Sequence, residues 1–366
     1  MTTKTWSRRS FLRGSIGAMA GLSLSPWLCA ADAAVDERLP ATADAFVKAN
    51  GFHGVIHLVR KGRVAFSRAY GMADVEAGRR TAIDTLYPIA SISKWLASVT
   101  VLRLVDQGKL KLDAPVSSYL TDFRPDTGGK VRLKHLLSNA SGIPNGFTPM
   151  VKADAGLWNR NFTTAEAIKA FCSGDLVFEP GSRFDYQFTN WILVKGIVET
   201  VTGKDFAEAV DALTLAPLGL KNIIPGYADA ARTRVAAGYA SIEPPVRKMY
   251  PVRAYTLASG GYCGTATDLV RAAEGVYGSS LLSASSRKAL NTVLVPAESY
   301  ALGGRVRSIT VDGEPSPFAW ETGRVDGYRS LLAHRLDGKA TLVVLNNTDL
   351  SQKTIDLFGE AMLMTS

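Results

Sequence analysis

Residues 88–110 carry apolar side chains at the three- and four-residue spacing of a buried helix. A glycine, Gly108, stands where such a helix would end. The pattern therefore predicts a buried helix whose first turn contains Ser91 and Lys94. The apolar positions that repeat are Trp95, Leu96, Val99, Leu102 and Val105.

Strand-like, β-rich runs lie near both ends of the chain, over residues 54–71 and 329–347. The first run is divided by a Lys-Gly pair at 61–62, and the second by an Asp-Gly pair at 337–338. An Asp-Gly loop of two residues favours a type I′ turn, so each run predicts a hairpin. A third hairpin is predicted to turn at residues 312–313.

The middle of the chain, residues 112–270, shows mostly helical patterns interrupted by Gly, Pro and Asn. Its clearest helix is predicted over residues 189–203, with Thr189 as a candidate N-cap and Gly203 as its end. No repeat, low-complexity segment or linker divides the chain.

Strands, then helices, then strands again predict one antiparallel sheet assembled from both ends of the chain. We therefore expect a single α/β domain of the α+β type over residues 34–366. Its α/β part comprises residues 34–111 and 271–366, and residues 112–270 form a mainly helical subdomain. A cleft between these layers is the expected place for a functional site.

Composition supports a globular protein with a sizeable core, since 46% of the 366 residues are hydrophobic and 20% are charged. The formal net charge is +9, but the lysines and arginines are scattered singly along the chain. This distribution is typical of a solvated surface, and we expect no nucleic-acid partner and no stable membrane insertion.

Residues 1–33 are similar to a twin-arginine export signal. Arg8 and Arg9 are followed by Phe-Leu, a weakly apolar run and an Ala-Asp-Ala cleavage site at 31–33. A basic amphipathic tail is the alternative. The export signal predicts a periplasmic or secreted protein, because twin-arginine substrates cross the membrane already folded.

Other reaction chemistries find little support in the sequence. Beyond the signal, Cys172 and Cys263 are the remaining cysteines, and the sequence leaves open whether they pair. The chain has no metal-ligand cluster, no Gly-rich nucleotide loop and no G-x-S-x-G pentapeptide. We therefore expect no metal, no cofactor and no esterase of the α/β-hydrolase type.

The predicted helix at 88–110 begins with an S-x-x-K motif formed by Ser91 and Lys94. A helix N-terminus favours developing negative charge, and a lysine one turn later can stand beside the serine. Burial would lower the proton affinity of that amine and allow it to act as a base. An N-cap serine is the alternative, and a second S-x-x-K at Ser285 and Lys288 lies in a polar stretch.

Most of residues 52–348 resembles the serine β-lactamase-like family, which includes class C β-lactamases, D,D-peptidases, D-aminopeptidases and family VIII carboxylesterases. The resemblance implies a β-lactamase/transpeptidase-like fold, an α/β sandwich with an all-helical subdomain. The matching text runs from Phe52 to Leu120 and continues at LKHLLSNASGIP, FEPGSRFDYQFTNWILVKGIVE, SGGYCGTATDLVRAAEGVYG and FAWETGRVDGYRSLLAH.

The resemblance implies catalytic roles for three residues. The family's S-x-x-K makes Ser91 the nucleophile and Lys94 the group that activates it. Its Y-x-N element falls on residues 186–188, so that Tyr186 shuttles protons while Phe188 replaces the asparagine. Some carboxylesterase-like members also have an apolar residue there. The sequence leaves open whether Lys94 or Tyr186 takes the serine proton.

The family's Lys-Thr-Gly or His-x-Gly element falls on Glu321, Thr322 and Gly323. In relatives the cationic or imidazole side chain helps to hold a substrate carboxylate. Two like charges about 4 Å apart at an effective dielectric of about 20 repel by roughly 4 kcal/mol. We therefore expect a neutral or cationic substrate and poor β-lactam turnover. Protonation of Glu321, or its neutralisation by Arg324 or Arg329, remains open.

The resemblance also implies an oxyanion hole made by the backbone N–H groups of Ser91 and Arg324. Together these features predict an exported serine hydrolase that forms an acyl-enzyme on a small-molecule or peptide-like ester or amide. Esterase, amidase or D-amino-acid peptidase action is favoured. The alternatives are a β-lactamase or D,D-carboxypeptidase, an acyltransferase, and a sensor that is acylated without turnover. The oligomeric state is not predicted.

Overall fold

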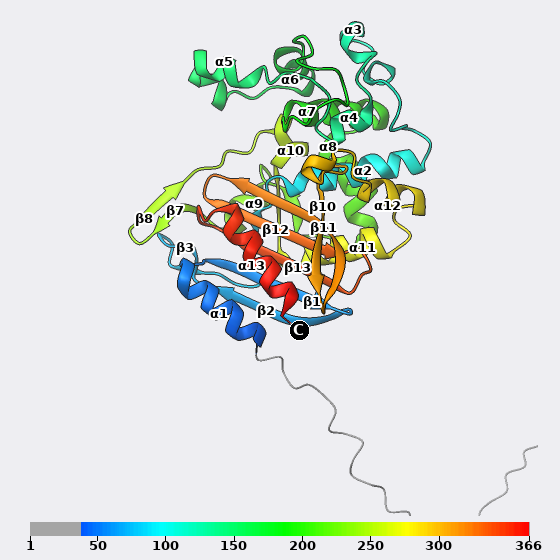
Figure 1. Cartoon of the computed structure of the whole chain (residues 1–366). Helices are drawn as coiled ribbons and strands as arrows, with labels where there is room; N and C mark the ends of the chain where they lie inside the picture. Colours follow the sequence, from blue (N-terminus) through cyan, green and yellow to red (C-terminus); the bar gives the residue numbers. More distant parts are fainter. Residues whose placement is uncertain (1–37, 366) are drawn as a thin grey trace, which may run out of the picture. The chain divides into compact units, whose positions relative to one another are not determined.

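A six-stranded antiparallel sheet joins the two ends of the chain (Figure 1). The computed structural model describes residues 38–365, so the predicted export signal lies outside the described residues. Strand order is β10-β11-β12-β13-β1-β2, which confirms a sheet assembled from both ends. The strands are β1 (Gly54–Arg60), β2 (Arg63–Tyr70), β10 (Arg305–Val311), β11 (Glu314–Val325), β12 (Tyr328–Arg335) and β13 (Ala340–Asn346).

Helices cover both faces of this sheet. Successive side chains of β13 (Ala340–Asn346) point alternately into the two cores that these helices form. Leu342 and Val344 pack with α1 (Arg38–Asn50) and α13 (Gln352–Met364). Val343 and Leu345 belong to the larger core on the other face, which includes α2 (Ile92–Asp106) and α11 (Ala266–Gly278). A central strand buried on both faces reads as one continuous apolar run, as the sequence of β13 does.

The middle of the chain packs most of its helices around α2 and α7 (Figure 1). Short strands also occur there: β7 and β8 form a hairpin, and β6 and β9 form a small sheet with β5, which precedes α2. The helices are α3 (Pro125–Gly128), α4 (Leu133–Leu137), α5 (Phe147–Ala153), α6 (Thr164–Phe171), α7 (Thr189–Thr202), α8 (Phe206–Val210), α9 (Asp229–Arg234), α10 (Leu257–Gly260) and α12 (Ala284–Asn291). The short strands are β3 (Met72–Asp74), β4 (Arg79–Arg80), β5 (Tyr87–Pro88), β6 (Ile223–Pro225), β7 (Gly238–Ile242), β8 (Pro245–Lys248) and β9 (Tyr262–Gly264).

Two of the three predicted hairpin turns have the expected form. At 61–62 and at 312–313 both loop residues have positive φ, as a type I′ turn requires. The hairpin predicted around 337–338 is confirmed by the antiparallel pairing of β12 and β13, but its two-residue type I′ turn is wrong. The strands stop at Arg335 and resume at Ala340, and within that loop only Gly338 has positive φ. The Asp337 side chain accepts the Lys339 N–H at 3.0 Å, which stabilises the longer loop locally.

The predicted helices at Ser91 and Thr189 are confirmed as α2 and α7, and glycines with φ of 71° and 65° follow them at positions 108 and 203. Thr189 is not an N-cap, however, because Phe188 occupies that position. The helix therefore begins with an apolar residue packed against its neighbours. Within residues 38–365, no helix is both long and apolar enough to span a bilayer.

Cys172 and Cys263 are both free and buried, which answers the question that the sequence left open. Burial raises the pKa of both thiols, that of Cys263 to about 12. A thiolate is the reactive form of cysteine, so neither residue is suited to nucleophilic catalysis at neutral pH.

Candidate active site

Ser91 lies at the N-cap position of α2, but its side chain does not cap the helix. Its Oγ instead lies 3.0 Å from Nζ of Lys94, one helical turn later. The preceding residue, Ala90, has a φ of 46°, which is unusual for a residue with a Cβ and costs about 1–3 kcal/mol. The backbone therefore turns sharply just before the serine, and the hydroxyl faces an amine rather than the helix end.

Lys94 is 3% exposed and makes two hydrogen bonds through its ammonium group. Besides the Ser91 hydroxyl, Nζ contacts the main-chain carbonyl of Ser259, 2.5 Å away, at the end of α10. The second contact fixes the direction of the amine toward the serine. Sequence reasoning missed Ser259, because a main-chain carbonyl has no residue signature.

Tyr186 completes the group that the sequence predicted. Its ring centroid lies 4.8 Å from Nζ of Lys94, and the residue is 42% exposed. Trp191 approaches the same amine, with its ring 5.9 Å away. A cation near aromatic rings is stabilised by their π-electrons. The structure thus brings the hydroxyl of Ser91, the amine of Lys94 and the ring of Tyr186 together at a partly open surface.

The buried residue Tyr300 packs against the ring of Tyr186. It was not predicted from the sequence. The two rings pack edge to face with centroids 6.3 Å apart, and the Tyr300 hydroxyl accepts a hydrogen bond of 3.0 Å from Asn139 Nδ2. Asn139 is buried, has a φ of 52°, and also accepts a hydrogen bond from Trp191 Nε1. This network limits the positions available to Tyr186.

The second S-x-x-K motif forms no comparable site. Ser285 and Lys288 are exposed on the short helix α12, and the Ser285 hydroxyl pairs with Ser283 at 2.9 Å. The two S-x-x-K motifs therefore differ in the burial of the lysine and in the presence of the Tyr186 ring, not in the motif itself.

The end of β11 runs next to the segment that leads into Ser91. A Cβ on Gly323 would lie 2.3 Å from the carbonyl oxygen of Ile89, so only glycine permits this approach. Strand β11 pairs with β10 as far as Trp320. Its last residues, 321–325, pair with β12 alone. The predicted oxyanion donor, Arg324, therefore lies on a strand end beside the helix of Ser91.

Thr322 does not share the face of Glu321 and Gly323. It pairs with Leu331, whose side chain belongs to the core beneath α13. Neighbouring residues of a strand point to opposite faces, so the Thr322 side chain lies on the face away from α2. The structure brings Gly323, but not this side chain, against the segment before Ser91.

Glu321 is 5% exposed and packs against Gly304. Burial raises its pKa to about 8, while Arg305 acts in the opposite direction. The alternative of a protonated carboxyl is therefore the one that the structure favours, and Arg305 rather than Arg324 or Arg329 is the opposing charge. At pH 7 the group is mostly neutral, so the negative charge on which the predicted repulsion depends forms only as the pH rises toward 8 and beyond.

A glutamate held neutral by burial makes stability depend on pH, and we expect Glu321→Gln to weaken that dependence. The folded-state pKa is raised from 4.5 to about 8, so the stability present below pH 4.5 is lost as pH rises toward 8. The shift corresponds to at most about 5 kcal/mol. Urea unfolding at pH 5 and pH 9 should show a smaller loss for the variant. Equal losses in wild type, Glu321→Gln and the exposed control Glu314→Gln would contradict the assignment.

Phe188, predicted to contact substrate, lines a cavity of about 410 Å³ that reaches Ser259. Its ring packs edge to face on Phe147, with centroids 5.3 Å apart. The residue that replaces the family's asparagine thus belongs to an apolar wall close to Lys94. Among the described residues, no cluster of His, Cys, Asp and Glu could hold a metal ion.

Known proteins that are similar in sequence or fold include hydrolases. The Beta-lactamase family profile matches residues 39–358. Esterase EstB of Burkholderia gladioli is 33% identical over 296 residues, covering 70% of this chain and 74% of that protein. The fold is similar to that of EstCE1, described as a hydrolase with promiscuous acyltransferase activity, with a TM-score of 0.75, 20% identity, and coverage of 90% and 98%. D-amino acid amidase from Ochrobactrum anthropi SV3 gives a TM-score of 0.75, 20% identity, and coverage of 91% and 98%.

Proposed function

Because this chain belongs to the Beta-lactamase family and its relatives are serine hydrolases, we propose that it hydrolyses esters or amides through an acyl-enzyme on Ser91. The observation that carries the proposal is the contact between Ser91 Oγ and Lys94 Nζ, with the ring of Tyr186 beside the same amine. We also propose that the enzyme acts outside the cytoplasm, on the basis of the signal-like residues 1–33.

In the acylation step, the Ser91 oxygen attacks the substrate carbonyl carbon, and the serine proton passes to the Lys94–Tyr186 pair. Collapse of the tetrahedral intermediate breaks the bond to the alcohol or amine, which leaves with that proton. In deacylation, a water molecule gives a proton to the same pair, attacks the ester carbonyl and releases the acid. Ser91 recovers its proton, so the cycle balances.

The negative oxygen of each intermediate would be stabilised by the backbone N–H groups of Ser91 and Arg324. The first lies at the N-terminus of α2, where helix amides favour negative charge. The second is carried by the strand end that only Gly323 allows to approach so closely. Each donor of this kind typically contributes about 10²–10³ in rate.

The substrate that we propose is neutral or cationic. The position that a cation occupies in relatives holds Glu321 here, which is buried and mostly protonated at neutral pH. A neutral Glu321 does not attract a substrate carboxylate at pH 7, and an ionised Glu321 above pH 8 repels it. Esterase EstB, with 33% identity, makes an ester the first class to examine.

Ester turnover should therefore exceed β-lactam turnover by a wide margin. At pH 7 we expect kcat/KM for p-nitrophenyl butanoate to be at least about 100-fold higher than for nitrocefin, which carries a carboxylate. Two opposite charges about 4 Å apart at an effective dielectric of about 20 attract by roughly 4 kcal/mol, so losing this attraction corresponds to two or more decades at roughly 1.4 kcal/mol per tenfold. Initial rates of both reactions by absorbance measure this ratio. A comparable or higher value for nitrocefin would show that the substrate class is wrong.

A further inference from the structure

We propose that the apolar cavity beside Ser259 binds the acyl group of the substrate and selects acyl groups that carry an aromatic ring. The inference rests on the proposed function, since it concerns the group that becomes attached to Ser91. The cavity has a volume of about 410 Å³, which is within the usual range for small-molecule sites. Its apolar lining consists of Phe147, Val151, Phe188, Tyr250, Pro251 and Tyr255.

The position of the cavity assigns it to the acyl side of the substrate. Ser259 lines it, and the carbonyl of the same residue holds the amine of Lys94. Tyr186 packs instead against Phe184 and Tyr300, outside the residues that line the cavity. A leaving group that takes its proton from Tyr186 departs on that side, so the acyl group extends toward Ser259.

The arrangement of the rings favours an aromatic occupant. Phe147 stands edge to face with Phe188, with an interplanar angle of 85°, and Tyr255 lies 6.4 Å from Phe147. Offset and edge-to-face contacts between rings add about 0.5–1.5 kcal/mol to the burial of apolar surface. A phenyl group can make such contacts with this wall, and an alkyl chain can make only the apolar ones.

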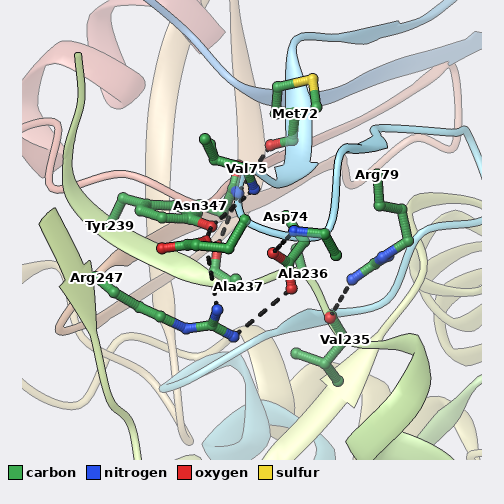
Figure 2. A network of polar contacts seen from close by, with 12 residues as sticks. Met72, Asp74, Val75, Arg79, Val235, Ala236, Ala237, Tyr239, Arg247 and Asn347 are labelled. Carbon is green, nitrogen blue, oxygen red and sulfur yellow. Dashed lines mark hydrogen bonds and ion pairs between the residues drawn. The ribbon is translucent and has the colours of Figure 1, made fainter. Parts of the chain in front are cut away.

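The wall is held in place from two directions, so little ordering is needed when a ligand binds. Tyr250 donates its hydroxyl to the carbonyl of Gly260, 3.1 Å away. At the end of β8, Arg247 forms ion pairs with Asp74 and Glu76, at 3.6 and 3.3 Å. Figure 2 shows Arg247 extending from β8 toward Asp74 on the neighbouring hairpin. Tyr250, Pro251 and Arg253, which follow Arg247 along the chain, supply one side of the cavity.

Turnover of two esters that differ in a phenyl group tests the proposal. We expect kcat/KM for p-nitrophenyl 3-phenylpropanoate to exceed that for the propanoate by about tenfold or more. Val151→Trp fills the cavity from α5, and Thr148→Trp fills it from the exposed rim. Both variants should reduce the ratio toward one. Ala153→Trp, exposed on the same helix and outside the cavity lining, should keep it.

A second measurement separates this inference from the proposed function. Calorimetry with Ser91→Ala should show 3-phenylpropanamide binding at least about tenfold more tightly than propanamide. If the wild type hydrolyses both esters equally well, and the two amides bind equally, the cavity does not select the acyl group although the enzyme is a hydrolase. If neither ester is hydrolysed but the aromatic amide binds preferentially, the proposed function fails and the cavity remains a binding site for aromatic groups.

Discussion

Replacing Ser91 with alanine is expected to lower kcat/KM for p-nitrophenyl butanoate by at least about 10⁴-fold. The substitution removes the hydroxyl that lies 3.0 Å from the Lys94 amine, and with it the acyl-enzyme. The remaining rate should come from the oxyanion donors and from binding alone. Steady-state kinetics with wild type and variant, checked for equal thermal midpoints, measure the effect.

Ser285→Ala is the matched control, since it removes the serine of the second S-x-x-K motif from an exposed helix. It should leave the rate unchanged. Full esterase activity in Ser91→Ala would show that the nucleophile has been assigned to the wrong residue. Labelling of the wild type by a fluorophosphonate without any ester turnover would point to a sensor that is acylated and not released.

Replacing Lys94 with methionine is expected to lower kcat/KM for the same ester by about 10²–10⁴-fold, the usual contribution of a positioned proton-transfer group. Methionine fills a similar volume, so the buried position next to Ser259 stays occupied. Because Ser91 and Lys94 act as a unit, the double variant should be no slower than Ser91→Ala alone. Single and double variants measured at one pH test this non-additivity.

Lys288→Met provides the corresponding control, as this lysine is exposed and belongs to the second motif. We expect it to retain wild-type kinetics. A Lys94→Met enzyme with unchanged kcat/KM would show that the amine does not take part in proton transfer. A double variant much slower than either single variant would show that Ser91 and Lys94 do not act as a unit.

The sheet was predictable because its signals are local. The hairpin at 61–62 depends on two adjacent residues that accept positive φ, and β13 on a continuous run of apolar residues. Predictions from local sequence failed where a neighbouring side chain changes the preferred turn or helix cap. Asp337 bonds to the next residues and lengthens its loop, and Phe188 takes the N-cap position because apolar packing outweighs a side-chain cap.

The candidate site was predictable in part, for a similar reason. Ser91 and Lys94 are three residues apart on one helix, so their proximity follows from helical geometry. The motif alone could not separate them from Ser285 and Lys288, which have the same spacing on an exposed helix. The resemblance to a hydrolase family made that distinction, and burial of Lys94 is its physical counterpart.

The amino-acid sequence by itself determined the sheet built from both chain ends, the helix that carries Ser91, and the family. The tertiary structure alone decided that the Ser259 carbonyl orients the lysine, that Tyr300 backs Tyr186, and that a cavity with aromatic walls adjoins them. It also decided the protonation of Glu321, because a pKa depends on desolvation by residues distant in the chain. Periodicity reports only neighbours along one element, whereas distances and burial arise when separate elements pack together.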